Sequence, residues 1–431
     1  MLLDWVGQIF VALTFAGCAG LVVVLLGMLY LLGLHLSLRR EGLAREAASL
    51  AQPLPPDIAL PHLVVQIPTF NEGAIVERAI ASATRLDWPR DKLHIQVCDD
   101  STDETTELAQ AAAQRAVEAG FDVTVIHRSV RNEFKAGALN NARAQTPHDY
   151  FAILDVDYVP EPDFLRRCMT VLLADAKLAF VQARVDFLNA DENAMTRAQA
   201  IMLDYHLGFE QATRSWAKHL LPFNGTCGIW RRAAIDAGGG WHGHTVLEDW
   251  DLSLRAGLKG WRGTFLVTVT AKGELPTDLA AWMAQQKRWV TGVGQVAWKL
   301  FPAIRSRHDI WSRAFWNTLI PFGTWLAYAM FAATLIVAAI AMLLRPSWAL
   351  GLMVWAVYAV TSWVLPAVML VANRTVGRRT PIARLALDYP LILVLSLYIS
   401  WASLRSMPAT LLGRHRVFVR TPKRGTAPNP P

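Results

Sequence analysis

The chain has 431 residues, of which 53% are hydrophobic and 18% charged, with a formal net charge of +7. This length allows two or three domains, and this apolar content is high for a soluble protein. The cysteines Cys18, Cys98, Cys168 and Cys227 form no Cys-x-x-Cys pair, which argues against disulfides and against a zinc site.

The chain begins with a long apolar segment. Residues 6–34 are almost all apolar, which exceeds the length of about 20 residues that a bilayer span needs. They lack the basic start and the small-residue cleavage site of a signal peptide. The basic stretch RREGLAR follows, so the positive-inside rule places residue 40 onward in the cytosol. We therefore predict an uncleaved transmembrane anchor over 1–38 and a basic, proline-rich linker over 39–60.

Strand and helix patterns then alternate through a domain predicted at residues 61–275. Strands are predicted at 62–68, 92–100, 121–127 and 150–156. Segments with helical periodicity separate these strands, and a long helix is predicted at 193–218. This order predicts an α/β fold with a mostly parallel sheet that helices cover. Ligands of such sheets bind outside the carboxyl ends of the strands.

The last third of the chain returns to apolar sequence. Residues 276–314 are amphipathic and rich in tryptophan, which is typical of helices on a membrane surface, and three apolar runs follow within 315–412. The stretch NRTVGRRTPIAR and the tail 413–431 are both basic, so both are expected in the cytosol. A single crossing between them would break that rule. The run 385–412 is therefore predicted to be interfacial or re-entrant, with a periplasmic tail as the alternative, and Asp388 within it should face protein or a water-filled cavity.

Two acidic pairs follow predicted strands. Asp99 and Asp100 end one strand, and Asp155-x-Asp157 ends another. Alternate residues of an extended chain point to the same side, so Asp155 and Asp157 offer two hard oxygen ligands to a divalent cation. Taken alone, each pair is more often a solvated turn or a helix cap.

Two more motifs lie further along the chain. Glu248-Asp249 begins a predicted helix, where acids are common. Gln285-x-x-Arg288-Trp289 places an amide, a guanidinium and an aromatic ring on about one helical turn. That set suits a phosphate and a stacked ring, although arginine and tryptophan also anchor helices at membrane interfaces.

In this order the motifs resemble the pattern D, DxD, (T/E)ED and QxxRW of processive, membrane-embedded family 2 glycosyltransferases, the cellulose-synthase superfamily. Stretches such as QIPTFNE and FNGTCGIWRRAAI are similar to the branch that holds mannan, glucomannan and glucan synthases. The resemblance covers about residues 60–300, and FVRTPK (418–423) is similar to the gating-loop motif FxVTxK, with Arg420 in place of valine. The resemblance implies a GT-A domain, which is a Rossmann-like nucleotide-sugar domain, inserted between transmembrane helices.

The resemblance also implies a role for each motif residue. Asp155 and Asp157 would hold Mg²⁺ or Mn²⁺ on the sugar diphosphate, and Asp249 would be the general base for the acceptor hydroxyl. The implied donor-binding residues are Asp99, Asp100, Lys135, Asp155, Gln285 and Arg288. The implied acceptor-binding residues are Phe223, Asn224, Gly225, Glu248 and Trp289.

The implied function is an inverting glycosyltransferase that polymerises a β-linked polysaccharide from a nucleotide sugar. The product would be a β-1,4-mannan, a glucomannan or a β-glucan, and the donor GDP-mannose or UDP-glucose. The alternatives are a non-processive lipid glycosyltransferase with a ceramide- or polyprenyl-type acceptor and a non-catalytic membrane scaffold. The expected partners are the donor, the growing polysaccharide and the lipid bilayer, without nucleic acid; a homo-oligomer or accessory subunits remain open. The catalytic domain would face the cytosol from a bacterial inner membrane or a Golgi-type membrane.

Overall fold

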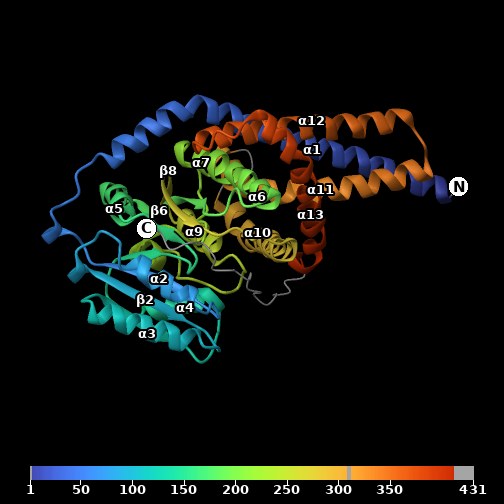
Figure 1. Ribbon diagram of the computed structural model, residues 1–431. Helices are drawn as coiled ribbons and strands as arrows, with labels where there is room; N and C mark the ends of the chain where they lie inside the picture. Colours follow the sequence, from blue (N-terminus) through green and yellow to red (C-terminus); the bar gives the residue numbers. More distant parts are fainter. Residues whose placement is uncertain (1, 308–311, 412–431) are drawn as a thin grey trace. The chain divides into compact units, whose positions relative to one another are not determined.

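The computed structural model describes residues 2–307 and 312–411, which form two compact units (Figure 1). One unit is helical, and the other is an α/β domain. Of the described residues, the helical unit takes those up to Ser37, Asn193–Thr213 and those from Asp278 to Leu411. The α/β unit takes Leu38–Glu192 and Arg214–Thr277.

An eight-stranded mixed sheet forms the centre of the α/β unit, in the order β3-β2-β1-β4-β7-β6-β8-β5. Its strands are β1 (Leu63–Thr69), β2 (Leu93–Asp99), β3 (Asp122–His127), β4 (Tyr150–Ile153), β5 (Val159–Pro160), β6 (Leu178–Phe187), β7 (Gly228–Arg231) and β8 (Arg262–Gly273). The first four strands are parallel, as are β6 and β8, whereas β7 and β5 run antiparallel to their neighbours. The predicted α/β fold with a mostly parallel sheet is confirmed.

Helices connect these strands and bury apolar faces against them. The helical segments of this unit are η1 (Asp57–Ala59), α2 (Ile75–Ala83), η2 (Arg90–Lys92), α3 (Thr105–Glu118), α4 (Phe134–Arg143), α5 (Phe164–Ala174), α8 (Arg232–Ala237) and α9 (Glu248–Leu258). In α5, Phe164, Cys168 and Leu172 recur at helical spacing and are fully buried. Strands β1 and β2 are buried along almost their whole length, as expected for parallel strands covered on both faces.

The helical unit holds the long apolar segments. Its elements are α1 (Leu2–Leu50), which continues into the α/β unit, α6 (Ala194–Asp204), the π-helix η3 (Tyr205–Gln211), α7 (Ala212–Trp216), which also continues into that unit, α10 (Leu279–Arg307), α11 (Arg313–Leu344), α12 (Trp348–Thr375) and α13 (Ile382–Leu411). Among the described residues, four helical segments are long and apolar enough to cross a membrane: Leu3–Leu50, Leu326–Leu344, Trp348–Thr375 and Ile382–Thr410.

Two sequence expectations change at this level. The predicted linker 39–60 is helical as far as Leu50, because RREGLAREAASL consists mainly of good helix formers. The run predicted at 385–412 is helical as far as Leu411, within the single helix α13, and its interfacial or re-entrant placement stays a prediction. The helix predicted at 193–218 includes the π-helical turn η3 in its middle. The tail 413–431 with its gating-like motif lies outside the described residues.

The expectation for Asp388 is confirmed within the helical unit. Its side chain is buried, with Arg384 at 3.4 Å on the same helix and Arg197 of α6 at 3.5 Å. An ionisable group in an apolar helix is tolerated when it is paired and faces the interior. The two arginines therefore explain how α13 accommodates a carboxylate.

Candidate active site

Two of the predicted acids, Asp99 and Asp155, lie at or just beyond the carboxyl ends of parallel strands in the α/β unit. Asp99 is the last residue of β2, and Asp155 lies two residues beyond the end of β4. Strand β1 lies between β2 and β4 and is parallel to both, so the carboxyl ends of β2 and β4 lie at the same edge of the sheet. This is where ligands bind in parallel α/β sheets.

Lys135 of α4 joins three of the predicted motifs. Its Nζ donates to Asp155 Oδ1 at 2.6 Å and to the carbonyl oxygen of Gly225 at 2.9 Å. Glu248 Oε1 lies 3.8 Å away from the same nitrogen. Burial would lower the pKa of Lys135, but the carboxylates of Asp155 and Glu248 outweigh it and raise that pKa, so the side chain stays charged. The ammonium holds the acids together where a diphosphate would add further negative charge.

Gly225 brings the backbone against the predicted general base. Its φ of +82° favours glycine, and a Cβ built there would lie 2.8 Å from Asp249 Oδ2. The same Cβ would lie 3.7 Å from Lys135 Nζ. Only a residue without a side chain fits this position, which leaves the space beside Asp249 and Lys135 open.

Asp249 lies in the first turn of α9 and is 7% exposed. Its burial and the neighbouring Glu248 carboxylate raise the pKa of Asp249 to about 8, although Lys135 lowers it. A general base is most effective when its pKa lies near the working pH. The environment of Asp249 therefore suits a group that accepts a proton during turnover and releases it afterwards.

Asp99 and Asp100 bind neighbouring side chains. Asp99 is fully buried and accepts hydrogen bonds from Ser101, Thr106 and His127. Burial would raise the pKa of Asp99, but these hydrogen bonds outweigh it and hold that pKa below its usual range. The carboxylate is therefore ionised and firmly held.

Asp100 forms a two-pronged ion pair with Arg128, with both N–O distances at 2.7 Å. Arg131 lies 3.9 Å from the same carboxylate and 3.4 Å from the centre of the Phe70 ring. Neither arginine was predicted as a site residue from the sequence. The only signal for them was the cluster of basic residues just before Lys135.

The predicted acceptor residues Phe223, Asn224 and Gly225 form the FNG loop, and contacts in the protein interior hold this loop. Phe223 is fully buried and packs edge-on against Phe180 at 5.3 Å and Trp230 at 5.4 Å between ring centres. A direct contact of Phe223 with an acceptor would require its ring to leave this cluster. The backbone N–H of Asn224 donates to Gln182 Oε1 at 3.0 Å.

Gln182 was not predicted, yet it shapes the FNG loop. This buried side chain also donates to the carbonyl oxygens of Thr226 at 2.9 Å and Cys227 at 3.1 Å. Its signal in the sequence was a polar residue in the middle of the apolar strand β6. Gln182 thereby fixes the backbone on both sides of Gly225.

The predicted metal ligands offer a suitable set of donor atoms. Asp157 is 1% exposed, and the Asp155 side chain is 29% exposed. Two carboxylates fit Mg²⁺ or Mn²⁺, which accept oxygen ligands and complete their coordination with water and phosphate. The donor set therefore fits the implied metal.

Gln285, Arg288 and Trp289 lie on α10 in the helical unit and are half-buried. They share one helical turn, as their spacing predicted. Their donor and acceptor roles stay predictions.

The family described as "Glycosyltransferase like family 2" matches residues 61–292 of this chain. This match spans more than half of the chain, so the protein belongs to that family. The resemblance seen in the motif order is thereby confirmed.

The curated relatives include plant enzymes. Glucomannan 4-beta-mannosyltransferase 9 of Arabidopsis thaliana is 41% identical over 268 residues, which cover 60% of this chain and 50% of the relative. Glucomannan 4-beta-mannosyltransferase 1 of Oryza sativa subsp. japonica is 40% identical over 261 residues, which cover 59% and 50%. This chain spans about half the length of the curated relatives it matches.

A solved structure shares the fold. The mannosyltransferase PcManGT from Pyrobaculum calidifontis, in complex with GDP-Man and Mn²⁺, has a TM-score of 0.57 at 19% identity and covers 94% of this chain and 100% of its own. The likeness confirms a GT-A-like domain flanked by long apolar helices.

Proposed function

We propose that the protein is a metal-dependent, inverting mannosyltransferase that extends a β-1,4-linked mannan or glucomannan from GDP-mannose. The observation that carries this proposal is the meeting of Lys135, Asp155, Gly225 and Asp249 at the carboxyl edge of the sheet. The choice of mannose rests on the names of the relatives and on the ligand of the structural neighbour.

The chemistry assigned to the site is a single displacement. The acceptor hydroxyl oxygen bonds to the anomeric carbon as the bond from that carbon to the diphosphate breaks, and the hydroxyl proton passes to Asp249. Attack from the face opposite the leaving group turns an α-linked donor into a β-linked product. Lys135 stays charged beside the departing diphosphate and stabilises it. Asp155 and Asp157 would hold a divalent ion that neutralises charge on the same diphosphate.

Other residues would position the substrates. Asp99 and Asp100 would order the nucleotide side of the site, where Asp100 fixes Arg128. Asn224, Gly225 and Glu248 would face the acceptor, and Phe223 would support them from the core. From α10 we propose that Gln285 and Arg288 bind the donor diphosphate and that Trp289 stacks on an acceptor sugar.

The proposed setting is a membrane. The catalytic domain would face the cytosol, and the helices that are long and apolar enough to cross the bilayer would hold the enzyme beside its growing polymer.

Membranes that contain the protein test this function when they are supplied with Mn²⁺ and labelled GDP-mannose or UDP-glucose. We expect a polymer from GDP-mannose that β-mannanase digests, and no product after EDTA treatment. A matched Asp155→Asn, Asp157→Asn preparation should lose transfer as well. A lipid that carries a single sugar, a polymer from UDP-glucose alone, or full activity in EDTA would contradict the proposal.

A further inference from the structure

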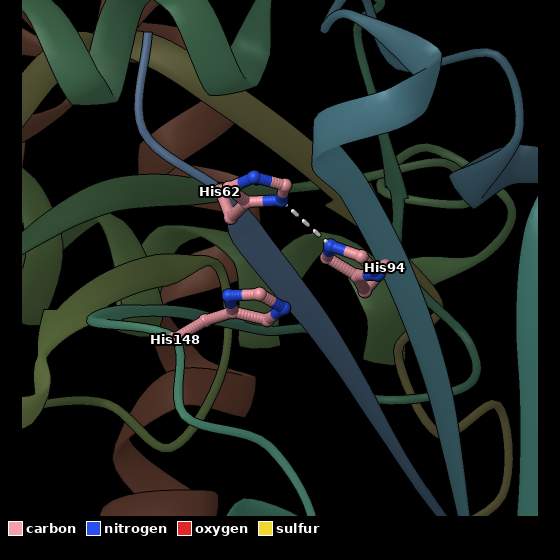
Figure 2. A group of neighbouring side chains, drawn as sticks. All are labelled: His62, His94 and His148. Carbon is pink, nitrogen blue, oxygen red and sulfur yellow. Dashed lines mark hydrogen bonds between the residues drawn. The ribbon is translucent and has the colours of Figure 1, made fainter.

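Three histidines meet at the edge of the sheet opposite the candidate active site. His62 directly precedes β1, His94 is the second residue of β2, and His148 lies two residues before β4 (Figure 2). Strands β2, β1 and β4 are parallel neighbours, so the cluster lies at their amino ends. Along β2, His94 and Asp99 are separated by about 17 Å, taking about 3.3 Å per residue. The cluster is therefore separate from the acids of the transferase site.

The ligand atoms of the three rings are close together. His62 Nδ1 and His94 Nε2 are 3.0 Å apart, and one nitrogen from each of the three rings lies within 4.8 Å of the others. Two nitrogens bound to one tetrahedral Zn²⁺ at about 2.0–2.1 Å lie about 3.3 Å apart. The first pair is already near this distance. His148 stacks on His62 and His94 with ring centres 4.7 and 4.3 Å apart, and its ring would have to rotate to bring a nitrogen to a shared ion.

Asp122 provides an independent sign of a metal site. It is the first residue of β3, and its Oδ2 accepts a hydrogen bond from His94 Nδ1. An ionised carboxylate only accepts hydrogen bonds, so the proton lies on Nδ1 and the lone pair of Nε2 faces His62. Metal-binding histidines commonly donate their second nitrogen to a carboxylate in this way. The arrangement prepares His94 as a ligand.

We propose that His62, His94 and His148 bind a Zn²⁺-class ion and that this ion joins the amino ends of β1, β2 and β4. Three imidazoles select zinc, copper or nickel over the harder Mg²⁺ and Mn²⁺. His62 is exposed, which leaves room for water as the fourth ligand. The cysteines form no zinc motif, and spacings of 32 and 54 residues between the histidines give none in the sequence either.

The test uses the full-length protein in detergent, stripped of metal by a chelator and then titrated calorimetrically with Zn²⁺ in excess Mg²⁺. We expect one tight zinc equivalent in the wild type, none in the variant His62→Ala, His148→Ala, and a 10–100-fold weaker affinity in Asp122→Asn. Bound zinc should also raise the melting temperature of the wild type but not of the double variant. Transfer activity of both variants in zinc-free buffer checks that they are folded.

Two controls locate the ion. His242→Ala, His244→Ala removes another pair of neighbouring rings, 5.3 Å apart, and should keep the zinc equivalent. Asp155→Asn, Asp157→Asn should keep it too. The proposal is overturned if the wild type binds no tight zinc, if the folded His62→Ala, His148→Ala variant binds as the wild type does, or if either control loses the zinc.

Discussion

Asp249 and Glu248 are adjacent carboxylates whose charges depend on each other. Burial and, after it, the Glu248 carboxylate raise the pKa of Asp249 to about 8. Asp249 must be deprotonated to act as a base, so kcat/KM for the donor should rise with pH and be half-maximal near pH 8. In Glu248→Gln the negative charge is gone, and the midpoint of the kcat/KM profile should move to lower pH. An unchanged midpoint would contradict this coupling.

Asp249→Asn is the matching test of the base itself. The amide has nearly the shape of the carboxylate but cannot accept the proton, so kcat should fall by about 10²–10⁴. Binding of GDP-mannose, measured by calorimetry, should stay close to that of the wild type. A variant that keeps most of its kcat would remove Asp249 from this role.

The variant Gly225→Ala tests whether the backbone at this position must approach Asp249 closely. In Gly225→Ala the new Cβ would collide with the Asp249 carboxylate, and a displacement of about 1 Å at a reacting group can cost about 10² in rate. Gly260→Ala is the control, because Gly260 also has a positive φ, +92°, but has no atom within 4 Å of an added Cβ.

Both glycine variants should lose about 1–2 kcal/mol of stability from the left-handed backbone alone. Only Gly225→Ala should lose most of its kcat at a temperature where both proteins remain folded. Equal losses of kcat in the two variants would show that backbone strain, and not the contact with Asp249, is responsible.

At the scale of elements, Glu46 joins the end of α1 to the sheet. Its carboxylate is buried and accepts hydrogen bonds from the backbone N–H groups of Val267 at 3.0 Å and Thr268 at 2.7 Å, both in β8. Hydrogen bonds to a charged group contribute about 1.5–3 kcal/mol each. Glu46→Ala would leave two strand N–H groups without this acceptor, so we expect a loss of about 3 kcal/mol, visible as a lower melting temperature in detergent.

Glu41, one turn earlier on α1, is the control for Glu46. It is exposed and lies 3.6 Å from Arg45, and such surface pairs contribute about 0–1 kcal/mol. Glu41→Ala should therefore leave the melting temperature almost unchanged. A similar decrease in both variants would mean that helix propensity, rather than the link to β8, stabilises this part of α1.

At the scale of the whole molecule, the basic residues predict which parts share a side of the membrane. The α12–α13 connection is rich in arginine and should lie in the cytosol, whereas the short α11–α12 connection should lie on the other side. All four native cysteines are buried, so a single introduced cysteine should dominate labelling by an impermeant maleimide.

Three single cysteines test this topology. Ala383→Cys at the start of α13 and Ala111→Cys on α3 should react from the same side of sealed vesicles, and Pro346→Cys from the opposite side. All three positions are exposed. Labelling of Ala383→Cys from the side opposite to Ala111→Cys would contradict the predicted topology.

The sequence by itself determined the features that depend on local pattern. Alternating strand and helix periodicities gave the mostly parallel sheet, and the apolar runs indicated the long apolar helices. The order of the acidic motifs gave the family, and the position of Asp99 and Asp155 after buried strands placed them at the ligand-binding edge. These features follow from neighbouring residues, because backbone conformation and helix faces are set within a few positions.

Only the tertiary structure decided which distant residues meet. Lys135 and Gly225 are 90 residues apart, and they come into contact because the strand order brings α4 beside the FNG loop. The same order buries Phe223 in an aromatic cluster and gathers His62, His94 and His148 at the opposite edge. Periodicity shows which face a residue occupies but not which strand lies next to it, and that neighbour is fixed by packing across the whole sheet.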